Sequence, residues 1–190
     1  MNWLAHLYLS EPEVEFRVGN LLPDWLRPWE MVGLSEGFQR GILRHRAIDA
    51  FTDANPLVRR SVRRFEKSFR RYGGVLTDVF YDHFLAAGWS GHSTEPLGEF
   101  VHGFYDSVGE VRGHIPAEAC AVLEHMRAGD WLGSYATVAG IEMTLRRMSR
   151  RLRFPFDLAA AMGVLEAQYE GFREDFEGFF PMLKGEVLEG

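Results

Sequence analysis

Polar side chains recur in pairs, four residues apart, within the first 83 residues of the chain. The pairs are Asn2/His6, Asn20/Asp24, His45/Asp49 (extended one turn to Asp53) and Asp78/Asp82, with His83 directly after the last. Residues four apart share one face of a helix, so each pair can present two polar groups in the same direction. Imidazole nitrogens and carboxylate oxygens bind Mn²⁺, Fe²⁺, Mg²⁺ or Zn²⁺ where thiolates are absent. The sequence therefore predicts a divalent-metal site.

Each pair also has an ordinary structural interpretation. Asp24 and Asp53 can be caps or turn residues, and His6 can be a hydrogen-bonded core histidine. His45 with Asp49 can be an exposed helix pair. Asp82 lies between apolar neighbours, and a buried carboxylate needs a cation or strong hydrogen-bond donors. Taken together, the recurrence favours one shared site.

The elements that must position these side chains are helical, because apolar residues recur at helical spacing and no convincing strand alternation is present. Helices are expected at about 3–9, 14–22, 35–54, 56–72, 76–87, 95–110, 116–128, 131–150 and 156–187. Ser35 is the expected cap of the third helix, and Gly73-Gly74 is the expected end of the basic helix that starts at Pro56. The C-terminal aromatic residues, Tyr169, Phe172, Phe176, Phe179 and Phe180, read as core. We predict one all-α domain, a helical bundle covering residues 1–190.

Composition limits the class of protein. The chain has 190 residues, 46% of them hydrophobic, and a single cysteine, which excludes a disulfide framework and a thiolate metal cluster. No signal peptide or membrane span is expected, so a cytoplasmic location is predicted. The net charge is −6, but two stretches are basic, Arg59–Arg71 and Arg146–Arg153. An acidic protein with local basic helices is a poor general nucleic-acid binder but can dock an acidic partner.

The polar motifs together resemble those of a known family. Asn2-x3-His6, Gly19-Asn20-Leu21-Leu22-x-Asp24, Gly41-x3-His45-Arg46-x2-Asp49-x2-Thr52-Asp53 and Asp82-His83-Phe84 are similar in order and spacing to the bacterial acyl carrier protein phosphodiesterases, and the resemblance covers nearly the whole chain. It implies a metal-dependent hydrolase of fatty acid and lipid metabolism that cleaves the phosphodiester joining 4′-phosphopantetheine to a serine of holo-acyl carrier protein, with manganese as the typical metal. It also implies an HD-like fold. However, no His-Asp dipeptide occurs, and the nearest pair is reversed as Asp82-His83.

Phosphodiester hydrolysis builds negative charge on oxygen, which a metal ion and nearby cations stabilise. We predict four metal ligands: His45, Asp49, Asp82 and His83. One of His6 or Asp24 is expected to act as general base or leaving-group acid, and Arg46 to neutralise phosphate charge. The residues expected to orient the ligands are Asn2, Asn20, Asp53 and Asp78. The expected dock for the acidic carrier protein is the face formed by Arg59, Arg60, Arg63, Arg64 and Lys67, although that face can equally be a solvated helix surface.

Two other functions stay open at this point, and a third is disfavoured. A related metal phosphohydrolase acting on a nucleotide would share the metal site, and a non-catalytic binding protein of the same fold would lack metal-dependent turnover. A nucleic-acid binder is disfavoured by the overall acidity. The sequence sets neither the metal's identity and number nor the oligomeric state.

Overall fold

The computed structural model describes residues 1–188, and within that range the chain folds into helices without any strand. The α-helices are α1 (Trp3–Tyr8), α2 (Val14–Gly19), α3 (Glu36–Ala54), α4 (Pro56–Arg63), α5 (Gly73–Ala87), α6 (Leu97–Ser107), α7 (Ala117–Ala128), α8 (Trp131–Ser134), α9 (Val138–Ser149), α10 (Met162–Ala167) and α11 (Tyr169–Leu188). Short 3₁₀ turns separate them: η1 (Leu22–Asp24), η2 (Pro28–Met31), η3 (Arg70–Tyr72), η4 (Trp89–Gly91), η5 (Val108–Val111) and η6 (Leu158–Ala161). The predicted all-α class is confirmed.

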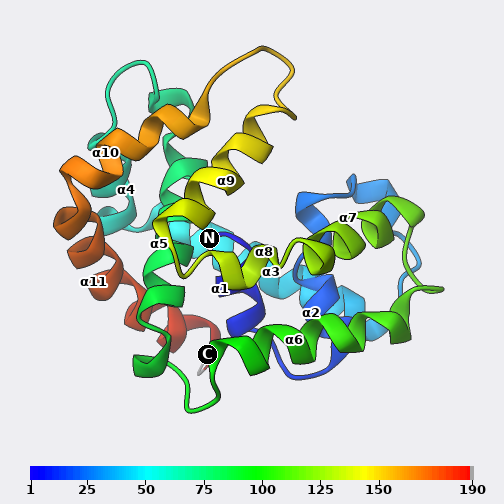
Figure 1. Cartoon of the computed structure of the whole chain (residues 1–190). Coiled ribbons are helices and arrows are strands. Elements are labelled where there is room, and N and C mark those ends of the chain that lie inside the picture. Colours follow the sequence, from blue (N-terminus) through cyan, green and yellow to red (C-terminus); the bar gives the residue numbers. More distant parts are fainter. Residues whose placement is uncertain (189–190) are drawn as a thin grey trace.

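The short helix α1 lies near the centre of the molecule (Figure 1). In that view α4, α10 and α11 lie to its left, and α2, α6 and α7 lie to its right. The buried apolar side chains form one continuous cluster that draws on both halves of the sequence. The predicted aromatic core of α11 is confirmed for its four phenylalanines, which are buried, while Tyr169 packs against the cluster partly exposed.

Helices α2 and α3 approach each other backbone to backbone. A Cβ atom on Gly19 would lie 2.4 Å from the carbonyl oxygen of Phe38, and one on Gly41 would lie 2.2 Å from that of Phe16. Neither position can therefore carry a side chain without separating the helices. This contact brings the turn after α2, which contains Asn20, against the middle of α3.

The basic helix is shorter than predicted. It ends at Arg63, and Gly73 begins α5 where the sequence suggested a helix end. Between them the chain turns so that Phe65 becomes buried against Phe80 and Phe172. Tertiary packing of one aromatic ring thus overrides the helical periodicity of the segment.

Two late helices are also interrupted. The predicted helix over 131–150 is broken into α8 and α9, and the one over 156–187 into η6, α10 and α11. Ser35 is the N-cap residue of α3, but its hydroxyl donates a hydrogen bond to Glu15 and does not cap the helix.

Candidate metal centre

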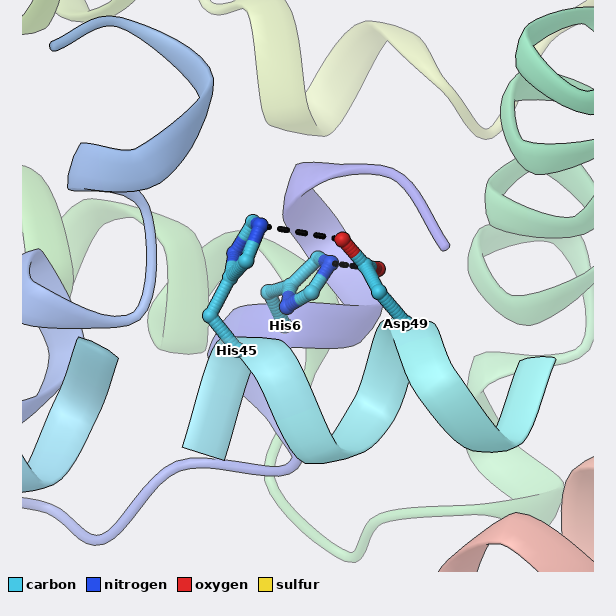
Figure 2. A group of neighbouring side chains, drawn as sticks. All are labelled: His6, His45 and Asp49. Atoms are coloured by element: carbon cyan, nitrogen blue, oxygen red, sulfur yellow. Dashed lines mark ion pairs between the residues drawn. The ribbon is translucent and has the colours of Figure 1, made fainter. Parts of the chain in front are cut away.

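Three predicted site residues meet where α1 lies against α3. Figure 2 shows His45 and Asp49 on consecutive turns of α3 and His6 reaching them from α1. Asp49 Oδ2 lies 3.0 Å from His45 Nε2, and Asp49 Oδ1 lies 3.3 Å from His6 Nε2. One ligand atom of each residue lies within 4.8 Å of the other two, a spacing at which all three can coordinate one metal ion. The two imidazole rings stack with centroids 4.3 Å apart.

Asn20 sets the orientation of both imidazoles. Its side-chain amide donates hydrogen bonds to the carbonyl oxygen of His6 (2.7 Å) and to Ser10 Oγ (2.8 Å), so its Oδ1 must be the atom that faces His6 Nδ1 at 3.0 Å. His45 Nδ1 faces the backbone carbonyl oxygen of Asn20 at 2.8 Å. Both Nδ1 atoms therefore carry a proton and donate it, which leaves the two Nε2 atoms with free lone pairs in the neutral rings.

Those lone pairs point at other acceptors. His6 Nε2 lies 3.1 Å from the carbonyl oxygen of Met1 as well as near Asp49. Acceptors so close together repel one another unless a cation lies among them, either a proton on an imidazole or a metal ion. The pKa values reflect this arrangement. Burial lowers the pKa of His45, but the hydrogen bond from its ring to Asp49 and the charges of Asp24 and Asp49 outweigh burial and raise it overall.

The carboxyl group of Asp49 stays ionised. Burial alone would raise its pKa, but hydrogen bonds from His45 and His6 and the positive charge of the Met1 amino group hold the pKa far below the usual range. That amino group lies 3.4 Å from Asp49 Oδ1 and 3.2 Å from Asp78 Oδ1. Burial lowers the pKa of the amine, yet Asp78 and the neighbouring carboxylates raise it to about 10.

Asp24 lies at the edge of the group. Its Oδ1 is 3.8 Å from His45 Nε2, and its Oδ2 accepts a hydrogen bond from the indole Nε1 of Trp3 at 2.9 Å. The side chain is 38% exposed, so solvent and substrate can reach it. A carboxylate that is accessible, oriented by an indole and close to the imidazoles can accept a proton during a reaction.

Asp82 lies outside this group and binds the backbone of α1 instead. The carboxylate is fully buried on α5 and accepts hydrogen bonds from the backbone amides of Leu4 (2.7 Å) and Ala5 (3.2 Å) at the start of α1. Strong donors thus satisfy the buried acid, as one of the sequence-based alternatives allowed. Burial raises its pKa to about 8 despite these two donors. Through these two hydrogen bonds Asp82 holds the start of α1 in place, and with it His6.

His83 forms its contacts with two tyrosines outside this group. Its Nδ1 lies 2.8 Å from the carbonyl oxygen of Tyr135 and its Nε2 lies 2.9 Å from the hydroxyl of Tyr169. Both ring nitrogens are therefore occupied away from His45 and Asp49, and burial lowers the pKa of the ring. The structure does not bring together the four predicted ligands: it groups His45 and Asp49 with His6.

The remaining predicted positions are spread around the centre. Asn2 donates to the hydroxyl of Tyr135 at 3.0 Å, and Asp78 pairs with the Met1 amine. Arg46 and Asp53 are exposed on α3. Met1, which contributes a backbone oxygen and an amine, was not singled out by the sequence. Its only signal was its position next to the Asn2/His6 pair.

The predicted docking face of α4 is partly committed to the fold. Arg60 and Arg64 both form ion pairs with Asp175 of α11, which is fully buried and also accepts a hydrogen bond from Ser61. Arg59, Arg63 and Lys67 are exposed. Two of the five predicted docking residues thus hold α4 against α11.

Known proteins match the chain over almost its full length. Residues 1–183 match the family described as acyl carrier protein phosphodiesterase. Proteins with that name from Photorhabdus laumondii and Salmonella agona are each 30% identical, covering 96% and 98% of this chain and 93% and 97% of their own length. The protein of that name from Yersinia pestis is 29% identical over 96% of this chain and 95% of its own. No solved structure matches, and among residues 1–188 no helix has the length and apolar character that crossing a membrane requires. The chain belongs to the acyl carrier protein phosphodiesterase family.

Proposed function

We propose that this protein is a metal-dependent phosphodiesterase that removes 4′-phosphopantetheine from holo-acyl carrier protein in the cytoplasm. The observation that carries the proposal is that two imidazole Nε2 atoms and an ionised carboxylate lie close enough to share one cation, while Asn20 accepts a hydrogen bond from Nδ1 of each imidazole. Family membership supplies the reaction and the substrate class. We also propose that residues 1–190 form a single domain and that its fold is distantly related to that of the HD phosphohydrolases.

The donor set fits a divalent cation. His6, His45 and Asp49 would hold the ion through two nitrogens and one carboxylate, a combination that suits Mn²⁺, Fe²⁺ or Zn²⁺. Three protein ligands leave coordination positions for water and substrate, as catalytic sites require. When bound, such an ion supplies Lewis acidity to the phosphoryl group and makes water a stronger nucleophile near neutral pH. Manganese is the expected ion from the family resemblance.

The chain's own residues provide positioning and proton transfer. Asn20 keeps both imidazoles in the tautomer whose Nε2 can act as ligand. Asp24 is the expected general base, because it is accessible and 3.8 Å from His45 Nε2, whereas both nitrogens of His6 are engaged. Asp82 and the Met1 amine fix the start of α1. Asp82 and His83 are not included in the proposed ligand set, and the role of Arg46 on the phosphate stays a prediction.

Mass spectrometry of holo-acyl carrier protein tests this function directly. Incubation with the protein and Mn²⁺ should yield apo-carrier protein and free 4′-phosphopantetheine, and EDTA should stop the reaction until Mn²⁺ is restored. His45→Ala and Asp49→Asn should abolish turnover. The matched controls His102→Ala and Asp106→Asn, both at exposed positions of α6, should retain it. Turnover that survives EDTA, or a nucleotide substrate that is hydrolysed while the carrier protein is not, would contradict the proposal.

A further inference from the structure

A cavity of about 310 Å³ opens directly beside the metal centre. It shares Met1, Asp24 and Asp78 with the surroundings of that centre, and its other walls come from both halves of the chain. Those walls are formed by Asn2, Trp3, Trp25, Tyr72, Val75, Met148, Arg151, Leu152 and Leu158. The volume lies at the lower end of the range of about 300–1,000 Å³ that small-molecule sites occupy.

The cavity has two chemically distinct parts. Carboxylates and the Met1 amine lie on the side of the metal centre, while Val75, Leu152 and Leu158 supply an apolar wall. Two indoles, Trp3 and Trp25, lie edge to face with centroids 5.9 Å apart. A ligand for this cavity needs a reactive group at the polar side and a slender, partly apolar body beyond it.

One cationic side chain, Arg151, lines the cavity. It belongs to the second basic stretch, just beyond the C-terminal end of α9. Its guanidinium carbon lies 5.7 Å from the ring of Trp131, and that of Arg147 lies 4.5 Å from the same ring. Trp131 in turn stacks on Trp3, whose indole holds Asp24. A continuous stack thus connects the basic end of α9 to the edge of the metal centre.

We propose that this cavity binds the 4′-phosphopantetheine arm of the substrate, with Arg151 contacting the phosphate and the Val75 wall contacting the apolar part of the arm. The arm suits the cavity because it combines an anionic phosphodiester, hydrogen-bonding amides and a branched hydrocarbon segment. The inference rests on the proposed function, since the arm is the ligand that the proposed reaction releases. It assigns substrate recognition to residues within 148–158, which the sequence did not connect with the site.

Calorimetric titration of free 4′-phosphopantetheine into the Mn²⁺-loaded and the metal-free full-length protein tests the proposal without any turnover. Arg151→Ala should weaken binding about tenfold, as expected for loss of a charge-assisted contact. Val75→Trp should weaken it at least as much by filling the cavity. Two matched controls, Arg150→Ala next to Arg151 and Val138→Trp at a valine of similar exposure on α9, should stay within about twofold of the unaltered protein.

Arg151 and Val75 are both exposed enough for their substitution to leave folding intact, which circular dichroism verifies. The kinetic counterpart is the ratio of kcat/KM for holo-acyl carrier protein to that for bis(p-nitrophenyl) phosphate, which has no arm. Both cavity variants should lower this ratio, and neither control should.

The outcomes separate this inference from the function on which it rests. If the protein hydrolyses holo-acyl carrier protein but the cavity variants bind the free arm as well as the controls do, the cavity assignment is wrong and the function stands. If no carrier protein is hydrolysed, the function fails on its own test. The cavity assignment is also overturned if the unaltered protein does not bind 4′-phosphopantetheine, or if it binds adenosine monophosphate more tightly.

Discussion

Asn20 contacts both imidazoles of the candidate metal centre. Its side chain binds the ring and the backbone of His6, and its backbone carbonyl binds the ring of His45. Because both rings donate from Nδ1, both present Nε2 to Asp49. One buried residue therefore determines the protonation pattern of two imidazoles, the proposed ligands, that come from different helices.

Asn20→Ala should weaken Mn²⁺ binding by about 10–100-fold, the usual cost of removing a group that orients metal ligands. Metal titration followed by calorimetry measures this change. Asn55→Ala is the control, since Asn55 is also buried but caps α4 through the amide of Leu57. The control should lose about 1 kcal/mol of stability and keep its metal affinity. Equal loss of affinity in both variants would contradict the role given to Asn20.

The raised pKa of His45 links metal binding to pH. In the metal-free protein, the stability contributed by protonated His45 is fully present below the pKa of about 6.5 of the unfolded chain and is lost as pH rises through the higher folded value. The metal requires the neutral ring. Mn²⁺ should therefore stabilise the fold more at pH 8 than at pH 6, by up to about 1.4 kcal/mol per pH unit while His45 titrates. The increase in Tm caused by Mn²⁺ should be correspondingly larger at pH 8.

Thermal denaturation with Mn²⁺ and with EDTA at both pH values provides the measurement. In His45→Ala, Mn²⁺ should raise Tm little at either pH. A metal-induced increase in Tm that is independent of pH in the unaltered protein would show that His45 does not lose a proton on binding.

At the residue scale the sequence could identify the pair His45 and Asp49, because spacing of four on a long helix leaves little freedom of direction. It could not assign Asp82. Spacing shows that a carboxylate is buried, but not whether a metal or backbone amides satisfy it, since the amides of Leu4 and Ala5 are 78 and 77 residues away. For the same reason the sequence could not show that the ring of His83 contacts Tyr135 and Tyr169.

The two glycines at the crossing of α2 and α3 control the site at the scale of elements. Gly41→Ala would place a methyl group 2.2 Å from the carbonyl oxygen of Phe16 and 2.7 Å from the amide nitrogen of Asn20. The helices must separate, which moves Asn20 away from His45. We expect a loss of roughly 1–3 kcal/mol in the free energy of unfolding together with weaker Mn²⁺ binding.

Gly103→Ala is the matched control, because Gly103 lies inside α6 with open space where its Cβ would be. That variant should gain about 0.5–1 kcal/mol of stability and leave metal binding unchanged. Urea denaturation and metal titration of both variants measure the difference. If Gly41→Ala were as harmless as Gly103→Ala, the close crossing would not be needed for the site.

The elements themselves were largely predictable, and their ends were not. The start of α4 at Pro56, after the N-cap residue Asn55, is predictable from the local sequence because proline favours the first position of a helix. Its end at Arg63 depends on Phe65 meeting Phe80 and Phe172, a contact between segments that periodicity cannot detect. For a similar reason the sequence could not show that two residues of the predicted docking face are paired within the fold. The partner of Arg60 and Arg64 is Asp175, more than a hundred residues away.

Across the whole molecule, the negative net charge and the basic segments would have opposite effects on the binding of an acidic partner such as the proposed carrier protein. In the proposed complex the net charge of −6 would repel an acidic carrier protein at long range, while the exposed arginines of α4 would attract it at contact distance. Raising the ionic strength from about 0.05 to 0.5 M shortens the screening length to a few ångströms. Both effects weaken, and the short-range attraction should dominate the measured change.

We therefore expect kcat/KM for holo-acyl carrier protein to fall about tenfold over that range. The value for bis(p-nitrophenyl) phosphate should fall much less, since that substrate makes no protein–protein contact. Steady-state kinetics with Mn²⁺ held constant makes the comparison. Parallel salt dependence of the two substrates would assign the effect to the metal centre and not to docking.

The sequence predicted a metal site within the first 83 residues but gave no indication of the cavity beside the group of His6, His45 and Asp49. The cavity needs Arg151, Leu152 and Leu158 from the second half of the chain. The stack of Trp131 on Trp3 brings this half to α1. Only the assembled fold places them together.

The buried carboxylate of Asp82 has one more consequence. The first amides of a helix usually lack partners and exchange their hydrogens with solvent readily, and a six-residue helix has little stability of its own. In α1, two of these amides point into a carboxylate fixed deep in α5. Deuterium should therefore enter the start of α1 only when α5 also opens, so the segment that carries His6 should be among the slowest to exchange although it lies next to the first residue.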